Sequence, residues 1–202
     1  MGRFMKKKLK DIADIRTGYQ FRGKVTASDK SNVVVIQIKD VDEHLFVQTS
    51  DLVPVKVENP EPYLVSQGDV LFLSRGHRQY ATMVTKPVKN TIATGYFFIV
   101  RPKASVIQPS FLVWTLNQPD FQESMRPFVR GSHIPLVTKM DFQNITIQIP
   151  PLAVQDRIMT LQSLFEREKK LSSAIKVKRQ QVVQAVSHKL ITGQLTVQGN
   201  QS

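Results

Sequence analysis

The last third of the chain contains an unusually long stretch that favours a single helix. No glycine or proline occurs from Ala153 to Thr192, and Gly193 then offers a stop signal. A helix of about 38 residues is roughly 57 Å long. A folded domain of ~150 residues has a radius of gyration of only about 15 Å. Much of the predicted helix is therefore expected to have no partner within this chain.

Apolar residues recur along this helix at spacings of three and four, with lysine and arginine on the opposite face. Val154 and Leu190 lie at the ends of this pattern. One alternative is that the helix folds back on its own domain. We instead expect it to pair with a helix of a second copy or of another subunit. The apolar stripe expected to form this interface consists of Ile158, Leu161, Phe165, Leu171, Ile175, Val182 and Val186.

Residues 1–150 differ in pattern, with short apolar runs broken by glycine, proline, asparagine and aspartate. Short helices are expected over residues 109–116 and from Pro119 to about Arg126, because Pro127 interrupts a helix. We predict an α+β fold with a strand-rich domain over residues 1–150 and a helical segment over residues 151–202. The runs expected to form strands are 33–38, 69–74, 79–85, 95–100 and 145–149.

The charge of the chain points to a polyanionic partner. Lysine and arginine number 28 against 16 acidic residues, which gives a formal charge of +12. Such an excess favours contact with the phosphates of DNA or RNA through counterion release, although a merely basic protein has the same composition. Cysteine is absent and no apolar run could span a membrane. We expect a cytoplasmic protein with no membrane contact and no disulfides.

The segments around the start of the helix follow a distinctive order. Gly131-Ser132-His133-Ile134-Pro135 precedes the alternating residues 145–149, and Pro150-Pro151-Leu152-Ala153-Val154-Gln155 leads into the helix. This order resembles the DNA-specificity subunit of type I restriction-modification systems. There, a target-recognition domain ends in a GS-x-IP loop and an IPLPPLxxQ-like strand, followed by a spacer helix.

Three further segments are similar to the same family in the same order. They are residues 9–23 with a G-x-x-F turn, residues 68–76 with a GD-x-L-F sequence, and residues 111–122 with a helix pair. Two features depart from the family pattern. Residues 136–138 are Leu-Val-Thr where family loops often have His-Leu-Ser, and Pro127 interrupts the preceding helix.

The resemblance implies a noncatalytic subunit that reads double-stranded DNA. Its implied partners are an adenine methyltransferase subunit and, through it, a restriction or translocase subunit. A complete family member carries two recognition domains and two antiparallel spacer helices, whereas this chain carries one of each. We therefore expect a homodimer, paired through an antiparallel coiled coil, that reads an interrupted palindrome. Alternatives are a stand-alone DNA-binding or assembly module, or a fragment of a longer subunit.

Cationic and amide side chains gather in three segments where turns are expected, and a rigid sheet commonly presents such turns to a ligand. Arginine can bind guanine or phosphate in a forked geometry, and glutamine can read adenine. The alternative for each segment is a solvated turn or a simple connecting loop. The candidate DNA-binding residues are Arg75, His77, Arg78, Gln79 and Tyr80 in the first segment, Tyr19, Gln20, Arg22 and Lys24 in the second, and Arg130, Ser132 and His133 in the third.

No pattern for catalysis, a metal or a cofactor emerges. An adenine methyltransferase needs a glycine-rich cofactor loop and an Asn/Asp-Pro-Pro-aromatic element, but here Ile149 precedes the only Pro-Pro pair. The four histidines are scattered, which argues against zinc. The acidic run at residues 40–43 is best explained as a polar turn. We expect no catalytic residues, and any reaction must come from a partner.

Overall fold

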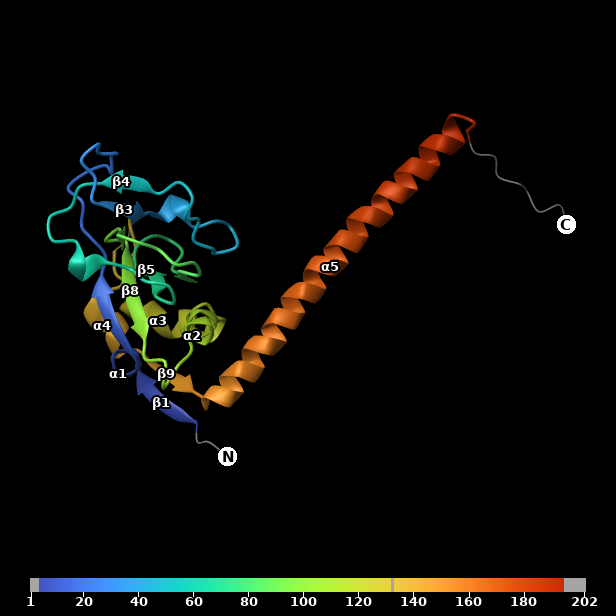
Figure 1. The fold of residues 1–202 in the computed structure, drawn as a ribbon. Coiled ribbons are helices and arrows are strands. Elements are labelled where there is room, and N and C mark those ends of the chain that lie inside the picture. The colour runs from blue at the N-terminus through green and yellow to red at the C-terminus, as the bar shows by residue number, and fades with distance from the viewer. Residues whose placement is uncertain (1–3, 132, 195–202) are drawn as a thin grey trace. The chain divides into compact units, whose positions relative to one another are not determined.

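The computed structural model describes residues 4–131 and 133–194 and has the predicted α+β fold (Figure 1). Its contacts divide the chain into two units, residues 1–156 and 157–202. The first unit contains all nine strands of the described residues, and the second contains most of the long helix. The functional division at residues 150 and 151 remains a prediction.

A four-stranded antiparallel sheet forms the centre of the first unit. Its strands lie in the order β2 (Ala13–Thr17), β8 (Phe97–Pro102), β5 (Val70–Leu73) and β6 (Ala81–Met83). The predicted runs 69–74 and 79–85 contain β5 and β6, and the run 95–100 overlaps β8, which extends further to Pro102. The outer strand β6 is held by Asn117, whose side chain exchanges two 2.9 Å hydrogen bonds with the backbone of Ala81.

Alternating residues of β5 fill two separate cores, as expected for a strand buried on both faces. On one face, the Phe72 ring stacks on Phe142 at 4.4 Å between centroids and lies near Phe98 and Phe121. On the other face, Leu71 and Leu73 belong to a second cluster with Phe97 and Ile99 of β8. The apolar composition of this strand is therefore explained by packing on both sides.

A smaller sheet contributes Ile36 and Ala93 to the second core cluster. It consists of β4 (Val53–Val55), β3 (Val33–Ile36) and β7 (Thr91–Ala93), with β3 antiparallel to β4 and parallel to β7. The 3₁₀ helices Ile38–Asp40 (η1) and Glu61–Tyr63 (η2) follow β3 and β4 in the chain. The predicted run 33–38 thus ends as a strand at Ile36, where the chain turns into η1.

Four short helices and a 3₁₀ turn complete the first unit. The helices α2 (Pro109–Leu116) and α3 (Pro119–Met125) are confirmed, and α3 is followed by η3 (Arg126–Phe128), where Pro127 ends the regular helix. The sequence analysis did not identify α4 (Lys139–Asn144), whose N-cap residue Thr138 accepts from the Asp141 backbone N–H at 3.1 Å.

The N-terminal residues pair with a strand from the far end of this unit. Strand β1 (Met5–Lys8) lies antiparallel to β9 (Thr146–Ile149), with Lys7 opposite Ile147. Helix α1 (Leu9–Ile12) follows β1 immediately and buries Leu9 and Ile12. The basic residues of β1 are thus part of a sheet, which the sequence analysis did not anticipate.

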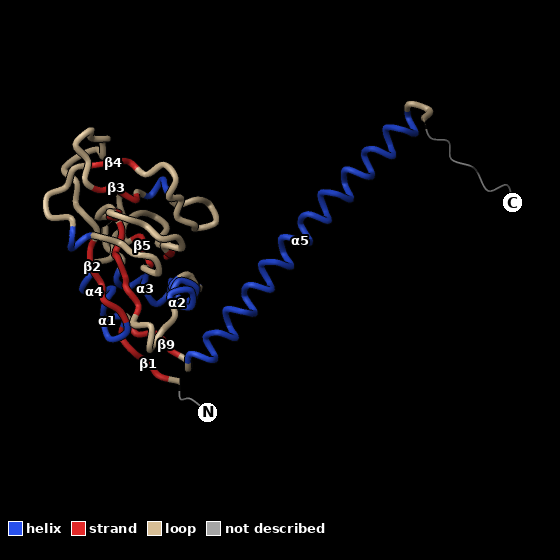
Figure 2. Tube along the Cα trace, in the orientation of Figure 1, coloured by secondary structure: helices blue, strands red, loops and turns tan. Residues whose placement is uncertain are grey.

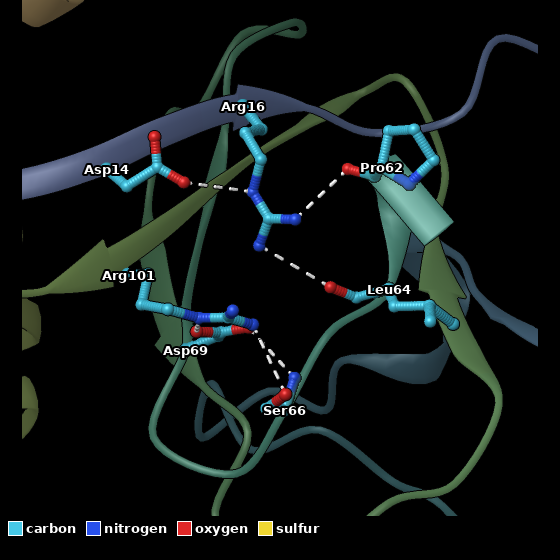
Figure 3. A network of polar contacts seen from close by, with 7 residues as sticks. All are labelled: Asp14, Arg16, Pro62, Leu64, Ser66, Asp69 and Arg101. Carbon is cyan, nitrogen blue, oxygen red and sulfur yellow. Dashed lines mark hydrogen bonds and ion pairs between the residues drawn. The ribbon is translucent and has the colours of Figure 1, made fainter. Parts of the chain in front are cut away.

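Two arginines of the central sheet connect it to η2 and to the segment between η2 and β5 (Figure 3). Arg101 binds the buried Asp69 carboxylate through two nitrogens, each at 2.7 Å. These hydrogen bonds raise the pKa of Arg101, so its charge persists at any working pH. Arg16 donates to the carbonyl of Pro62 at 3.1 Å and contacts Asp14 at 3.2 Å. The segment entering β5 is therefore fixed by polar contacts as well as by its core residues.

Helix α5 (Leu152–Ile191) runs without a break (Figure 2) and confirms the predicted long helix. Its residues from 163 to 191 are exposed, including the large apolar ones. In the apolar stripe, Ile158 is half-buried and the others are exposed by 65% for Leu161, 60% for Phe165, 56% for Leu171, 51% for Ile175, 61% for Val182 and 41% for Val186. Within the described residues, no helix is long and apolar enough to cross a membrane.

Candidate nucleic-acid interface

The first and third candidate segments lie next to each other. Arg75 and Arg130 both form isolated antiparallel bridges with Leu136. The Gly76 N–H donates to the Pro135 carbonyl at 2.8 Å, and the Val137 N–H donates to the Ser74 carbonyl at 2.9 Å. The loop that follows Arg130 is therefore attached by its backbone to the segment that follows β5.

The second candidate segment joins the same region through the turn between β7 and β8. The Gly95 N–H donates to the Tyr19 carbonyl at 2.7 Å, and the Ser74 N–H donates to the Tyr96 carbonyl at 2.9 Å. Gln20 adds a side-chain hydrogen bond to the Gly95 carbonyl at 3.2 Å. This turn thus connects all three candidate segments, because Ser74 also binds the loop that follows Arg130.

A hollow of about 180 Å³ lies between the second segment, Arg75 and the β7–β8 turn. A second hollow, of about 360 Å³, lies between the second segment, η1 and the same turn, and includes Lys24 and Lys39. Thr94 and Tyr96 line both hollows. We call the surface formed by the three segments and this turn the convergent surface.

Most of the basic side chains of the convergent surface are available to a ligand. Arg75, His77, Arg78, Arg22 and Lys24 are exposed, and no carboxylate within the described residues forms an ion pair with any of them. This surface can therefore attract an anion without first breaking an internal ion pair.

Arg130 is constrained in a different way. Its guanidinium binds Asp141 at 3.1 Å, and the Thr138 hydroxyl donates to the same carboxylate oxygen at 2.8 Å. Arg130 remains largely exposed, with a side-chain exposure of 68%. Its charge is partly compensated, so its position in the loop is fixed while its attraction for a phosphate is reduced.

The remaining predicted residues have different surroundings. His133 is exposed, and Ser132 lies outside the described residues. Gln79 is half-buried and donates to the Gly76 carbonyl at 2.6 Å, which closes the turn that contains His77 and Arg78. Gly76 has a φ of +117°, a conformation that glycine adopts at little cost.

Tyr80, predicted as a DNA-binding residue, lies in the core instead. Its side chain is only 9% exposed and belongs to the core cluster on the β3–β7 side of the sheet. Burial raises the pKa of its hydroxyl, although the nearby Arg78 acts in the opposite direction. A ring held in the core is not accessible to DNA, so Tyr80 is excluded from the convergent surface.

The sequence analysis missed the residues of the β7–β8 turn. Tyr96 is 48% exposed, and Thr94 is buried with a hydroxyl that has no hydrogen-bond partner among the described residues. The buried Nε2 of Gln37, in the wall of the second hollow, is also unpaired there. The available signal was the sequence Thr94-Gly95-Tyr96, in which an aromatic residue follows glycine between two apolar runs.

The convergent surface offers positive charge and hydrogen-bond donors to a ligand. Within residues 4–131 and 133–194, no group of histidines and carboxylates could hold a metal ion. Its donors are guanidinium, ammonium, amide and hydroxyl groups, which suit phosphates and the edges of bases.

Comparisons with known proteins point to one family. Residues 1–178 match the family model of the type I restriction modification DNA specificity domain. The chain is 21% identical over 159 residues to the Type I restriction enzyme HindI specificity subunit of Haemophilus influenzae, which is 77% of this chain and 34% of that protein.

Solved structures show the same fold. The S subunit from M. genitalium has a TM-score of 0.56 at 15% identity and matches 95% of this chain and 46% of its own. The HsdS subunit from Thermoanaerobacter tengcongensis has a TM-score of 0.58 at 20% identity, with 82% and 37% covered. A chain from a structural study of type I R-M complex assembly and conformational transition reaches 0.66 at 21% identity, with 92% and 45% covered.

This chain thus spans less than half the length of the relatives it matches. The family model, in contrast, covers most of the chain, from the N-terminal strand into α5. The chain belongs to the type I restriction-modification DNA specificity domain family.

Proposed function

We propose that this chain is a noncatalytic DNA-reading subunit that directs an adenine methyltransferase to a specific sequence. The observation that carries the proposal is the convergence of three separate polar segments on one surface, through Leu136 and the β7–β8 turn. Convergence allows several side chains to contact one stretch of duplex at once. A methyltransferase subunit, and through it a restriction or translocase subunit, would bind elsewhere on the chain.

The side chains of this surface suit two kinds of DNA contact. Arg75 is exposed, lies beside a hollow and has no internal ion pair among the described residues, so it is available for a forked contact with guanine O6 and N7. Lys24 and Lys39, on the edge of the second hollow, suit phosphates, whose contacts position the protein without reading sequence. Tyr96 lines both hollows, and its hydroxyl could donate a hydrogen bond to a phosphate or a base edge.

The exposed apolar stripe of α5 supports a dimer. Monomeric proteins rarely leave an extended apolar seam in water, and such a seam typically marks an interface. Two copies related by a two-fold axis would carry two identical recognition units. Their target would then be an interrupted palindrome whose gap depends on the length of the paired helices.

Methylation mapping tests the proposal most directly. DNA is sequenced for modified adenine from cells that contain the partner methyltransferase, with and without this chain. An interrupted palindromic motif modified only in the presence of the chain is the expected result. Failure to copurify with the methyltransferase, or a modification pattern that does not depend on the chain, would contradict it.

A substitution at the convergent surface tests which residues read bases. Arg75→Ala should weaken binding to the target by about 1–3 kcal/mol if the guanidinium reads a base. If the contact is to phosphate alone, the loss should be similar for all sequences. Lys10→Ala is a matched control, since Lys10 is an exposed cation on α1. Helix α1 precedes the start of β2, whereas Tyr19 follows the end of β2. Equal binding by both variants would exclude Arg75 from the interface.

A further inference from the structure

The apolar stripe of α5 contains one acidic side chain, Glu168. Helical positions advance by about 100° per residue, so Glu168 lies about 20° from Ile175 around the helix, whereas Glu166 lies about 180° from it. These two glutamates are the only acidic residues from residue 157 onward, against eight lysines and arginines. A lone carboxylate in a mostly apolar stripe of a basic helix requires an explanation.

Glu168 has a local hydrogen bond but no internal counterion. Its carboxylate accepts from the Ser172 hydroxyl at 2.8 Å, one turn further along the same stripe. None of the ion pairs within the described residues involves Glu168, Lys178 or Arg179. Lys178 and Arg179 lie beyond the midpoint of the stripe, between Ile175 and Val182 in the sequence. Arg179 lies about 40° from Ile175 around the helix, and Lys178 lies about 60° from it on the other side.

The positions of these charges are symmetric. Glu168 and the Lys178–Arg179 pair are equally distant from a point near residues 173 and 174. Phe165 and Val182 are equidistant from the same point, and so are Leu161 and Val186. If a second copy of the helix lies antiparallel to the first and is centred on this point, apolar residues face apolar residues and the carboxylate faces a cation.

We propose that Glu168 fixes the register of the expected antiparallel pair of α5 helices, centred on this point, through the partner subunit's Lys178 and Arg179. The inference rests on the self-association proposed above and specifies its geometry. In this register Phe165 faces the partner subunit's Val182, and Leu171 lies beside the partner subunit's Ile175. Charged residues within an apolar seam commonly specify register and orientation in this way.

In other arrangements of the same two helices, these charges face like charges or apolar residues. A parallel pair in register would oppose Glu168 with the partner subunit's Glu168, and Arg179 with the partner subunit's Arg179. Sliding the antiparallel pair by one heptad would bring Glu168 against Leu171 and Ser172 in one direction, or Ala185 and Val186 in the other. Each alternative buries a charge without a counterion, which is more costly than the proposed pairing.

Cysteine cross-linking tests the register. The chain has no native cysteine, so only the introduced cysteines can form disulfides. Full-length Phe165→Cys and Val182→Cys variants carrying different tags are mixed, allowed to exchange and oxidised. The expected result is a mixed disulfide between positions 165 and 182. Position 165 should not link to itself, because the two copies would lie about 25 Å apart along the axis.

The possible outcomes distinguish a failure of the proposed register from a failure of self-association. A link from position 165 to itself would show a parallel pair, and a dimer in sedimentation without the mixed link would show another register. Either result overturns the register and leaves self-association intact. A monomer at every concentration would overturn both proposals.

Charge reversal tests the role of Glu168. Glu168→Lys should raise the dimer dissociation constant by about 10- to 100-fold, because it creates two repulsive contacts in each dimer. Adding Lys178→Glu and Arg179→Glu to the same chain should restore dimerisation. Glu166→Lys is the matched control, with the same change of charge on the opposite face. Equal weakening by Glu166→Lys, or no rescue in the combined variant, would show that Glu168 does not set the register.

Discussion

The side-chain oxygen of Gln155 accepts a hydrogen bond from the backbone N–H of Gln108 at 2.9 Å. Its amide nitrogen donates to the carbonyls of Val106 and Pro150 at 3.0 and 2.9 Å. The side chain is fully buried. Gln155 ends the Pro150–Gln155 sequence by which the family resemblance was noted, and its role here is to hold the loop before α2 against the first turn of α5.

Replacing this amide should destabilise the first unit. Gln155→Leu removes three hydrogen bonds and leaves buried backbone groups without partners, so we expect a loss of about 2–4 kcal/mol in the free energy of unfolding. Urea denaturation measures this change. Gln184→Leu, the same substitution at an exposed site of α5, should stay within about 0.5 kcal/mol. Similar values for the two variants would contradict the role assigned to Gln155.

The Asp69–Arg101 pair gives a second prediction. Arg101→Met leaves the carboxylate of Asp69, which is 1% exposed, with its Ser66 backbone donor but without a counterion. Because the Arg101 side chain is about half exposed, we expect a loss of about 2–3 kcal/mol, below the value for a fully buried pair. Adding Asp69→Asn should recover part of it in a double-mutant cycle. Strict additivity of the two changes would argue against coupling.

A third prediction concerns the close approach of Gly18 to the β7–β8 turn. A Cβ atom at this position would overlap the carbonyl oxygen of Thr94. Gly18→Ala should therefore separate the second candidate segment from the turn, weaken DNA binding and lower the stability by about 2–4 kcal/mol. Gel-shift titration and thermal denaturation measure both effects. Thr17→Ala, at the exposed neighbouring position, is expected to change neither by more than about 0.5 kcal/mol.

A fourth prediction concerns acid sensitivity of the loop after η1. The backbone N–H of Phe46, with those of His44 and the Gln48 amide, lowers the pKa of the Asp42 carboxyl below its ordinary value of 3.8. A lowered pKa stabilises the fold above pH 3.8, and this contribution is lost as the pH falls through the folded-state pKa. The Phe46 amide should thus stay protected from exchange at pH 4 and lose protection at lower pH. NMR titration placing Asp42 at or above 3.8 would refute this.

Several elements were predictable because their local sequence allows few alternatives. The long helix α5 follows from the absence of glycine and proline over its length, and α2 and α3 each begin with a proline at the first helical position. Strand β5 was recognisable because an apolar run after Gly68-Asp69 suits a strand buried on both faces. In each case the decisive interactions are local or depend only on burial.

Other features depended on distant partners. The basic residues of β1 have no strand-like pattern, and they form a strand because β9 supplies backbone hydrogen bonds to them. Tyr80 lies among polar residues in the sequence, but antiparallel pairing after the turn at Gly76 directs its ring into the core. Tyr96 was missed for the opposite reason, since its apolar neighbours suggested burial while the turn exposes it.

The sequence alone determined that this chain would have a strand-rich α+β unit, an excess of positive charge and a long helix with an unpaired apolar stripe. These properties depend on composition and on local periodicity, which every segment carries within itself. Only the tertiary structure brought Arg75, Arg130 and Gln20 onto one surface. Their meeting depends on backbone hydrogen bonds between segments far apart in the chain, whose partners no local pattern specifies.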